Sequence, residues 1–351
     1  SGTTGNPKGV VHTHQSLYWA MENSRQHWSI DEHDIMLMPS PITHITGFCN
    51  GIEFPYYSGG TAAIMEKWNA QNALDYLNKL GATMSLGATP FLQELVDTAI
   101  KTDNKAPTLR LFACGGADVP ADLIDAANDW FDSISCCRVY GSSESPLVTQ
   151  GFIAASQRQE AANTDGEVVN YEVQIVANDG SALAVNQIGE VAVRGPAMML
   201  GYLQPEAQNS AFNQQGFFLT GDLGYLTSEK AIVITGRKKD LIIRGGENIS
   251  AKQIEDVLLE HHAVHEAAVV SMPHDRLGET SCAYVVLQPD KPFLFKQMQD
   301  HCDAAKLSKQ KFPERLEIID QLPRTPSGKV KKDVLRKMVR ESLTRQTSKT
   351  D

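Results

Sequence analysis

The sequence predicts an α/β protein that begins with a largely parallel sheet, continues through a small β-rich part and ends in an α+β domain. Three patterns support this. Strand-like apolar runs alternate with helix-like segments as far as residue 140, which is typical of parallel sheets covered by helices. From residue 168 short strands follow one another with turns between them. After the charged residues 237–240, helices and strands are mixed again.

In the first part, apolar spacing and turn residues define the elements. Ala73, Leu74 and Leu77 recur at helical spacing, and Pro90 suits the first turn of another helix. Residues 10–14 are expected to form a strand or a turn. The predicted strands are 35–38, 61–65, 83–86, 109–114 and 135–140, and the predicted helices are 15–25, 69–80, 90–100 and 120–130.

The second half is predicted from shorter signals. Ser250, with Gln253 three residues later, is a candidate N-cap with a capping box. A last helix at 332–343 would face inward through Leu335, Met338 and Val339, and the polar residues after it would fray. The predicted strands are 168–177, 189–194, 231–235, 267–272, 281–287 and 316–319. The expected divisions are an α/β part at 1–165, a β-rich subdomain at 166–238, a mobile α+β domain at 239–343 and a tail at 344–351.

Composition argues against several classes of protein. The net charge of −10 argues against a general binder of nucleic acid or anionic membranes. No apolar run approaches the ~18 residues of a membrane span, and no signal peptide is visible. The six cysteines form no Cys-x-x-Cys pair, and the adjacent Cys136 and Cys137 cannot easily bridge to each other. We therefore expect reduced, mostly buried thiols in a cytoplasmic protein.

Residues 1–9, Ser-Gly-Thr-Thr-Gly-Asn-Pro-Lys-Gly, form a glycine-rich stretch suited to a polyphosphate. Glycines let the backbone approach a ligand closely, successive N–H groups can hold anionic oxygens, and Lys8 adds a positive charge. The stretch is not a Walker A loop, because Pro7 stands where that motif requires a glycine before the lysine, and Gly9 replaces its Ser or Thr. Two more glycine-containing stretches, 115–117 and 141–144, follow strands, at the sheet edge where α/β proteins bind ligands.

This glycine-rich stretch and the motifs that follow it in order resemble the adenylate-forming superfamily of acyl-CoA synthetases, aryl-CoA ligases, peptide-synthetase adenylation domains and luciferases. The resemblance extends from Ser1 to about Val339. The family has a sizeable part before its phosphate loop, and this sequence has no initiator Met, so it resembles a fragment that begins at a functional motif. The motifs lie at residues 1–9, 39–48, 115–117, 140–144, 189–202, 220–222, 236–240 and 323–329.

The resemblance also implies the residues of the site. Lys329 matches the lysine that bridges the substrate carboxylate and the α-phosphate, and His44 matches the residue that gates the acyl pocket. Lys239 matches the hinge about which the smaller domain rotates between two steps. The expected nucleotide-binding residues are Ser1, Gly2, Thr3, Thr4, Gly5 and Lys8 in the phosphate loop, Gly116 and Ala117 beside the adenine and the acyl pocket, Tyr140 against the adenine, Gly141, Ser143 at the α-phosphate, Asp222 on the ribose hydroxyls and Arg237.

A metal ion is expected at one place. By the same resemblance, Glu144 would hold Mg²⁺, which prefers hard oxygen ligands and shares them with phosphates. The cluster of His261, His262 and His265 lacks a paired Cys or acidic ligand at metal-binding spacing. We expect these histidines to be solvated or to cap a helix.

The residues of the acyl pocket restrict the substrate. Peptide-synthetase adenylation domains carry an Asp in the stretch that corresponds to residues 39–48, where it holds the ammonium group of an amino acid. No residue from 39 to 48 is acidic here. An α-amino acid would leave its charge unpaired, at a cost of several kcal/mol, so we expect a carboxylate without an α-ammonium group.

The resemblance implies an acid–thiol ligase. A fatty, alicyclic or aryl carboxylic acid would attack ATP to give an acyl-adenylate and pyrophosphate, and CoA would then displace AMP. The alternatives are transfer to a carrier-protein thiol, or a nucleotide-binding fragment without turnover. The expected cofactors and co-substrates are ATP, Mg²⁺ and CoA. The expected partners are the small-molecule carboxylate and CoA. We expect no nucleic-acid partner and no membrane span. The oligomeric state is left open, and a homodimer is among the alternatives.

Overall fold

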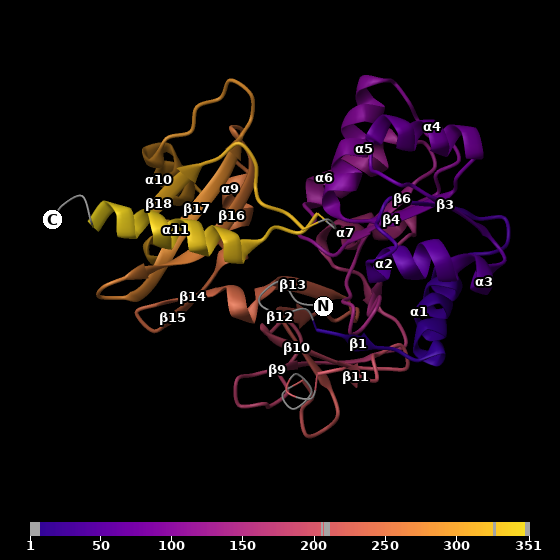
Figure 1. Cartoon of the computed structure of the whole chain (residues 1–351), viewed down its shortest axis with the longest axis horizontal. Coiled ribbons are helices and arrows are strands. Elements are labelled where there is room, and N and C mark those ends of the chain that lie inside the picture. Colours follow the sequence, from indigo (N-terminus) through magenta and orange to yellow (C-terminus); the bar gives the residue numbers. More distant parts are fainter. Residues whose placement is uncertain (1–7, 205, 207–210, 326–327, 348–351) are drawn as a thin grey trace.

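The computed structural model describes residues 8–204, 206, 211–325 and 328–347. Figure 1 shows an α/β lobe, a β-rich part beside it and an α+β domain that ends in helix α11. The predicted fold class is confirmed, since the three kinds of structure follow one another along the chain in the expected order.

The α/β lobe is built on a five-stranded sheet with the order β3-β2-β4-β5-β6. Every neighbouring pair in it is parallel, as the alternation of strands and helices predicted. The strands are β2 (Ile35–Met38), β3 (Thr61–Ile64), β4 (Met84–Gly87), β5 (Leu111–Gly115) and β6 (Ser135–Val139).

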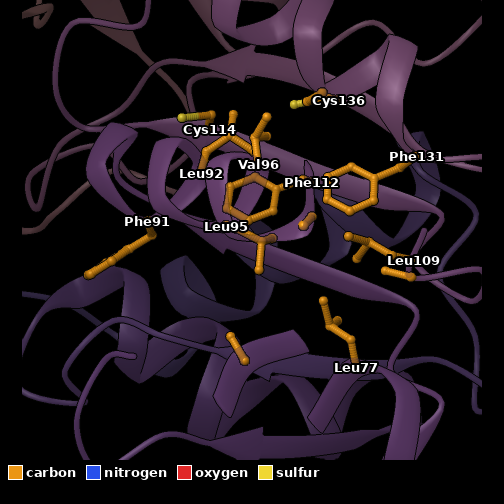
Figure 2. Packing of buried hydrophobic residues seen from close by; sticks show 14 of the residues in the cluster. Leu77, Phe91, Leu92, Leu95, Val96, Leu109, Phe112, Cys114, Phe131 and Cys136 are labelled. Atoms are coloured by element: carbon orange, nitrogen blue, oxygen red, sulfur yellow. The ribbon is translucent and has the colours of Figure 1, made fainter. Parts of the chain in front are cut away.

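Helices cover both faces of this sheet. Because side chains alternate along a strand, Phe112 of β5 points to one core and Leu111 to the other. Figure 2 shows the first core, in which Leu77 and Leu95 belong to helices packed on the Phe112 side. Helices α4 to α6 cover that face, and α1, η1 and α3 contribute to the opposite core. The helical segments are α1 (His14–His27), α2 (Ile45–Phe48), the π-helical turn η1 (Cys49–Glu53), α3 (Phe54–Ser58), α4 (Ala70–Leu80), α5 (Thr89–Lys101), α6 (Ala121–Trp130), η2 (Ala155–Gln157) and α7 (Arg158–Asn163).

The β-rich part is an antiparallel sheet with the order β13-β12-β10-β9, accompanied by the short pairs β1-β11 and β7-β8. The prediction of one strand over 168–177 is wrong, because Asn170 has a left-handed backbone (φ 54°) that separates β8 from β9. The strands are β1 (Val10–Val11), β7 (Thr149–Gln150), β8 (Glu167–Val168), β9 (Glu172–Val176), β10 (Gly189–Arg194), β11 (Gly201–Tyr202), β12 (Phe218–Leu226) and β13 (Ile232–Arg237).

The α+β domain follows the short 3₁₀ turn η3 (Lys238–Asp240). Its sheet has the order β15-β14-β17-β16, and β18 pairs with β17 in parallel. The elements are β14 (Leu241–Arg244), β15 (Glu247–Ser250), α9 (Ala251–Leu259), β16 (Val264–His274), β17 (Gly278–Leu287), α10 (Phe295–Ala304), η4 (Lys309–Lys311), β18 (Arg315–Ile318) and α11 (Lys332–Thr347).

Three details of this domain differ from or refine the prediction. Ser250 is the N-cap of α9, as predicted, but the side chain of Gln253 accepts a hydrogen bond from Lys311 (2.7 Å). Met338 was predicted to face inward, yet it is 41% exposed, because it lies at the border of the stripe buried through Leu335 and Val339. Helix α11 also continues to Thr347, so the chain does not fray from residue 344.

The predicted burial of the cysteines is confirmed, and His261 makes a hydrogen bond of the predicted capping kind. All six cysteines are buried and free. His261 accepts a hydrogen bond at Nδ1 from the backbone N–H of Ala263 (3.2 Å), and its ring stacks on that of His262 with centroids 4.6 Å apart. His261 therefore caps the turn after α9. Among the described helices, none combines the length and apolar character needed to cross a bilayer.

Candidate functional site

A cavity lies at the carboxyl ends of the parallel strands, where ligands of α/β sheets bind. It holds about 760 Å³ of empty space, part of it open to solvent. The segments that follow β2, β4, β5 and β6 each supply part of its wall, so the two glycine-containing stretches expected to mark a site do meet at one place. The ends of β4 and β5 contribute Gly87 and Gly115, and the following segments contribute Ser40, His44, Ala88, Gly116, Gly141, Ser142 and Ser143.

The rest of the wall is mostly apolar. Helix α1 and turn η1 contribute Met21 and Cys49, and the strands contribute Leu86 and Val139. Among the described lining residues, Lys329 is the one with a positively charged side chain, and none has a carboxylate side chain. The cavity therefore suits an uncharged, apolar group next to one positive charge.

His44 stands where this wall meets the site. It is the N-cap of α2, and its Nδ1 accepts a hydrogen bond from the backbone N–H of Thr46 (3.2 Å). Burial, together with the nearby charge of Lys329, lowers the pKa of His44 to about 4. The ring is therefore neutral at physiological pH, with its remaining proton on Nε2.

Lys329 reaches the cavity from the α+β domain. The segment before α11 extends from that domain toward the α/β lobe (Figure 1). An isolated bridge between Arg324 and Val330 closes the turn, and Arg324 donates a hydrogen bond to the Gly328 carbonyl (2.6 Å) and pairs with Glu266 (2.6 Å). The contacts of Arg324 therefore fix the base of the loop that carries Lys329.

Gly116 lies in the cavity wall beside that lysine. Its backbone is left-handed (φ 78°), a conformation that favours glycine. A Cβ at this position would lie 3.8 Å from Cε of Lys329. Burial and the neighbouring Arg237 lower the pKa of Lys329, whereas the carboxylates of Asp222 and Glu144 act in the opposite direction. The ammonium group thus lies within electrostatic reach of other predicted site residues, among them Arg237, Asp222 and Glu144.

Tyr140, Asp222 and Arg237 form a second, directly bonded group. Tyr140 donates a hydrogen bond from its hydroxyl to Oδ2 of Asp222 (2.8 Å), and Arg237 Nε lies 3.1 Å from Oδ1 of the same carboxylate. Asp222 and Arg237 are register partners of β12 and β13, so the sheet itself fixes this ion pair. Burial and the adjacent Asp222 raise the pKa of Tyr140 well above its ordinary value. The two contacts hold the carboxylate in one orientation. The residue Asp222 is largely buried, with 8% of its surface exposed.

Two family models match the sequence: one described as AMP-binding enzyme covers residues 1–203, and one described as AMP-binding enzyme C-terminal domain covers residues 253–329. The chain belongs to the AMP-binding enzyme family. This confirms the resemblance to adenylate-forming enzymes that the motifs indicated. Relatives of the chain in this family are adenylate-forming ligases.

Particular members of the AMP-binding enzyme family resemble the chain closely. The medium-chain fatty-acid–CoA ligase of Escherichia coli (strain K12) is 36% identical over 348 residues, which are 98% of this chain and 61% of that protein. The crystal structure of ATP-bound MatB from Rhodopseudomonas palustris superposes with a TM-score of 0.88 at 28% identity and covers 96% of this chain and 66% of that one. The o-succinylbenzoate coenzyme A synthetase (MenE) of Bacillus subtilis, in complex with ATP and magnesium ion, has a TM-score of 0.83 at 31% identity and covers 95% and 68%. The chain thus spans less than two thirds of the length of its Escherichia coli relative.

The AMP-binding enzyme motif at residues 140–144 is hydrogen-bonded to Tyr202, a residue for which no chemical role was predicted. Glu144 is 6% exposed, and its Oε1 accepts a hydrogen bond from the hydroxyl of Tyr202 (2.8 Å). Lys8 lies over the Tyr202 ring, 5.0 Å from its centroid. Tyr202 stands in the motif at 189–202 that the sequence marked as structural, and that motif was the available signal.

The remaining predicted residues are placed as follows. Ser143 lines the cavity, and its carbonyl accepts a hydrogen bond from His12 Nε2 (2.7 Å). Gly141 has no room for a side chain, since a Cβ would lie 2.5 Å from the backbone N of Leu147. Ala117 follows Gly116 in the loop after β5, and Lys239 lies exposed in η3 between the β-rich part and the α+β domain. Ser1, Gly2, Thr3, Thr4 and Gly5 lie outside the described residues.

Proposed function

We propose that the protein containing this chain activates a carboxylic acid with ATP and transfers the acyl group to CoA. In the first step a carboxylate oxygen attacks the α-phosphorus of ATP, the bond to the pyrophosphate group breaks, and an acyl-adenylate forms. In the second step the CoA thiol attacks the acyl carbon, and AMP leaves. The observation that carries the proposal is Lys329, which lies in one cavity with His44, Gly116 and Ser143 although it belongs to another domain.

Lys329 is suited to the first step because negative charge develops on the phosphoryl oxygens as the carboxylate attacks. A preorganised ammonium group stabilises that transition state more than the separate reactants. Because the contacts of Arg324 hold the loop in place, Lys329 needs less reorganisation when the carboxylate attacks. In the proposal, Lys329 bridges the reacting carboxylate and the α-phosphate, and Ser143 offers its hydroxyl to the same phosphate.

The bonded group of Tyr140, Asp222 and Arg237 supports a nucleoside site. The Asp222 carboxylate is held by two partners and retains further lone pairs, so it can accept hydrogen bonds from both ribose hydroxyls. Tyr140 would lie against the adenine and Arg237 near the nucleotide. Gly116 and Ala117 would border the adenine and the acyl group, and Gly141 would let the backbone approach closely.

Mg²⁺ fits the proposed site through one carboxylate. Among the described residues, no group of three or more His, Cys, Asp or Glu side chains is arranged to hold a metal ion. Mg²⁺ usually takes one or two carboxylates and completes its shell with waters and substrate phosphates, so Glu144 with the phosphates of ATP would suffice. The ion would supply positive charge to the phosphates, and Tyr202 would orient the Glu144 carboxylate.

The uncharged wall supports a fatty, alicyclic or aryl acid as the substrate. Met21, Cys49, Leu86 and Val139 offer no partner for an ammonium group, and the described lining residues include no carboxylate. The name of the Escherichia coli relative, a medium-chain fatty-acid–CoA ligase, agrees with this class of acid and with CoA as the acceptor. Neutral His44 would border the acyl group.

The two steps place different demands on the α+β domain. Lys329 is docked in the cavity, which suits the first step. In the proposal, the domain then rotates about Lys239, which lies in the short turn η3 between the two parts, and so admits CoA to the acyl-adenylate.

The test is exchange of labelled pyrophosphate into ATP that depends on an added carboxylate. The exchange should be measured on this chain and on the full-length protein, with fatty, alicyclic and aromatic acids. Exchange by the full-length protein with at least one class of acid is the expected result. If no acid supports exchange in the full-length protein, the proposed function is wrong.

A further inference from the structure

One ion pair joins the α+β domain to the α/β lobe outside the cavity. Lys252 Nζ, in the first turn of α9, lies 2.5 Å from Oδ1 of Asp118, in the loop after β5. The same ammonium group lies 2.8 Å from Oδ1 of Asp256, one turn further along α9. The Lys252 side chain is 20% exposed and that of Asp118 is 36% exposed, so the pair is partly withdrawn from water.

Asp118 belongs to the same loop that receives Lys329. It lies two residues after Gly116, which lines the cavity together with Lys329. The loop is fastened to α5, because Thr89 donates a hydrogen bond from its hydroxyl to the Asp118 carbonyl (2.6 Å). The α+β domain therefore touches one anchored loop at two points, through Lys329 and through Lys252.

A neighbouring contact of the same helix reaches the β-rich part instead of the α/β lobe. Ser250 Oγ donates a hydrogen bond to the Thr235 carbonyl (2.9 Å), which joins the start of α9 to β13 near the turn at Lys239. Lys252 reaches past this point to the α/β lobe. A rotation about Lys239 therefore separates Lys252 from Asp118, because the two residues belong to parts on opposite sides of the hinge.

We propose that Asp118 and Lys252 are positioning residues that favour the docked arrangement in which Lys329 enters the cavity. An interaction made in one of two arrangements shifts their equilibrium by its own free energy. Asp256 directs Lys252 from within its own helix but does not connect the domains. This inference rests on the proposed function for its kinetic consequence, although the docking itself is independent of it.

The expected effect of losing the pair is moderate and restricted to one step. Lys252→Ala and Asp118→Ala should each slow adenylate formation by about two- to five-fold, the range of partly exposed ion pairs. The conversion of supplied acyl-adenylate to the CoA thioester should be unchanged or faster, because that step does not use the docked arrangement. The double variant should be no slower than either single variant, since both substitutions remove the same interaction.

The matched control is Lys309→Ala, which breaks an exposed ion pair with Asp303 inside the α+β domain. It should leave both steps unchanged. Equal slowing by Lys309→Ala, additive slowing in the double variant, or slowing of both steps would overturn the positioning role. Exchange of labelled pyrophosphate into ATP by the unmodified protein tests the proposed function separately.

A second readout does not depend on catalysis. All six cysteines of this chain are buried, so spin labels can be placed at Lys101→Cys on α5 and Lys296→Cys on α10, both of which are exposed in the described part of the chain. Pulsed electron resonance should show the docked distance as the main population, and Lys252→Ala should reduce that population. An unchanged distance distribution in Lys252→Ala would overturn the inference, whether or not the protein catalyses exchange.

Discussion

The uncharged cavity wall makes a quantitative prediction about acids that carry a second charge. Hexanoate and adipate share a six-carbon chain, but adipate ends in a second carboxylate that would lie against Met21, Cys49, Leu86 and Val139. Among the described lining residues, Lys329 is the cation, and in the proposed reaction it holds the reacting carboxylate. The second carboxylate is therefore left without a counter-ion.

The least unfavourable way to bury that group is to bind it protonated. For a carboxyl pKa of about 4.3, protonation at pH 7 costs about 3.7 kcal/mol, since one pH unit corresponds to about 1.36 kcal/mol. This bounds the preference for hexanoate in kcat/KM at about 500-fold, and we expect about 50- to 500-fold because part of the cavity is open to solvent. This upper limit on the preference for hexanoate falls about tenfold for each unit by which the pH is lowered toward 5.

Pyrophosphate exchange by the full-length protein, measured with each acid at pH 6 and pH 7, checks this prediction. Monomethyl adipate is the matched control, because it keeps the length of adipate but replaces the second charge by an ester. It should be activated far better than adipate. If adipate lies within fivefold of hexanoate at pH 7, or if the monomethyl ester is as poor as adipate, the reasoning from charge is refuted.

The other predictions concern single residues. Lys329→Ala should slow adenylate formation by about 10²–10³, the effect of losing one preorganised charge partner, yet spare the conversion of supplied acyl-adenylate; poor use of that intermediate would contradict the role. Tyr140→Phe should raise KM for ATP about tenfold through loss of the hydrogen bond that orients buried Asp222, and an unchanged KM would argue against a nucleoside site there. The pKa of His44 is lowered to about 4, so the unfolded chain binds more protons below pH 6.5, and stability should fall as the pH drops from 6.5 to 4. His44→Gln should weaken that dependence in thermal unfolding, and an unaltered pH dependence would exclude His44 as its source.

Burial explains which parts of the fold could be predicted. Strands β2 and β5 lie between two layers of helices, so their residues form apolar runs that mark them in the sequence. Strand β12 was not predicted, because its Thr-Gly-Asp segment contains polar residues and Gly221, with φ 73°, and so has the composition of a turn. The hairpin of β14 and β15 was missed because the short apolar run of β14 is followed by Gly245, Gly246 and the polar start of β15, which together have the composition of a turn.

The lining of the candidate site was predictable where its residues stand in motifs. His44, Ser143 and Lys329 stand in recognisable motifs, and the structure brings them to one cavity. The contact of Tyr202 with Glu144 depends on the pairing of β11 with β1, a long-range arrangement that local patterns do not contain. The same is true of pairs such as Lys252 with Asp118, because a lysine in an amphipathic helix looks like any other solvated charge.

The division of the cavity between two domains has a consequence for the order of events. The wall that would contact the acyl group belongs to a sheet packed on both faces, whereas Lys329 arrives on a separate domain. In the proposed reaction, an acid would therefore contact the wall before the Lys329 ammonium group is in place. An acid that fits the wall poorly would dissociate during that interval without consuming ATP. Selectivity in such an arrangement depends on the residence time of the acid as well as on its affinity.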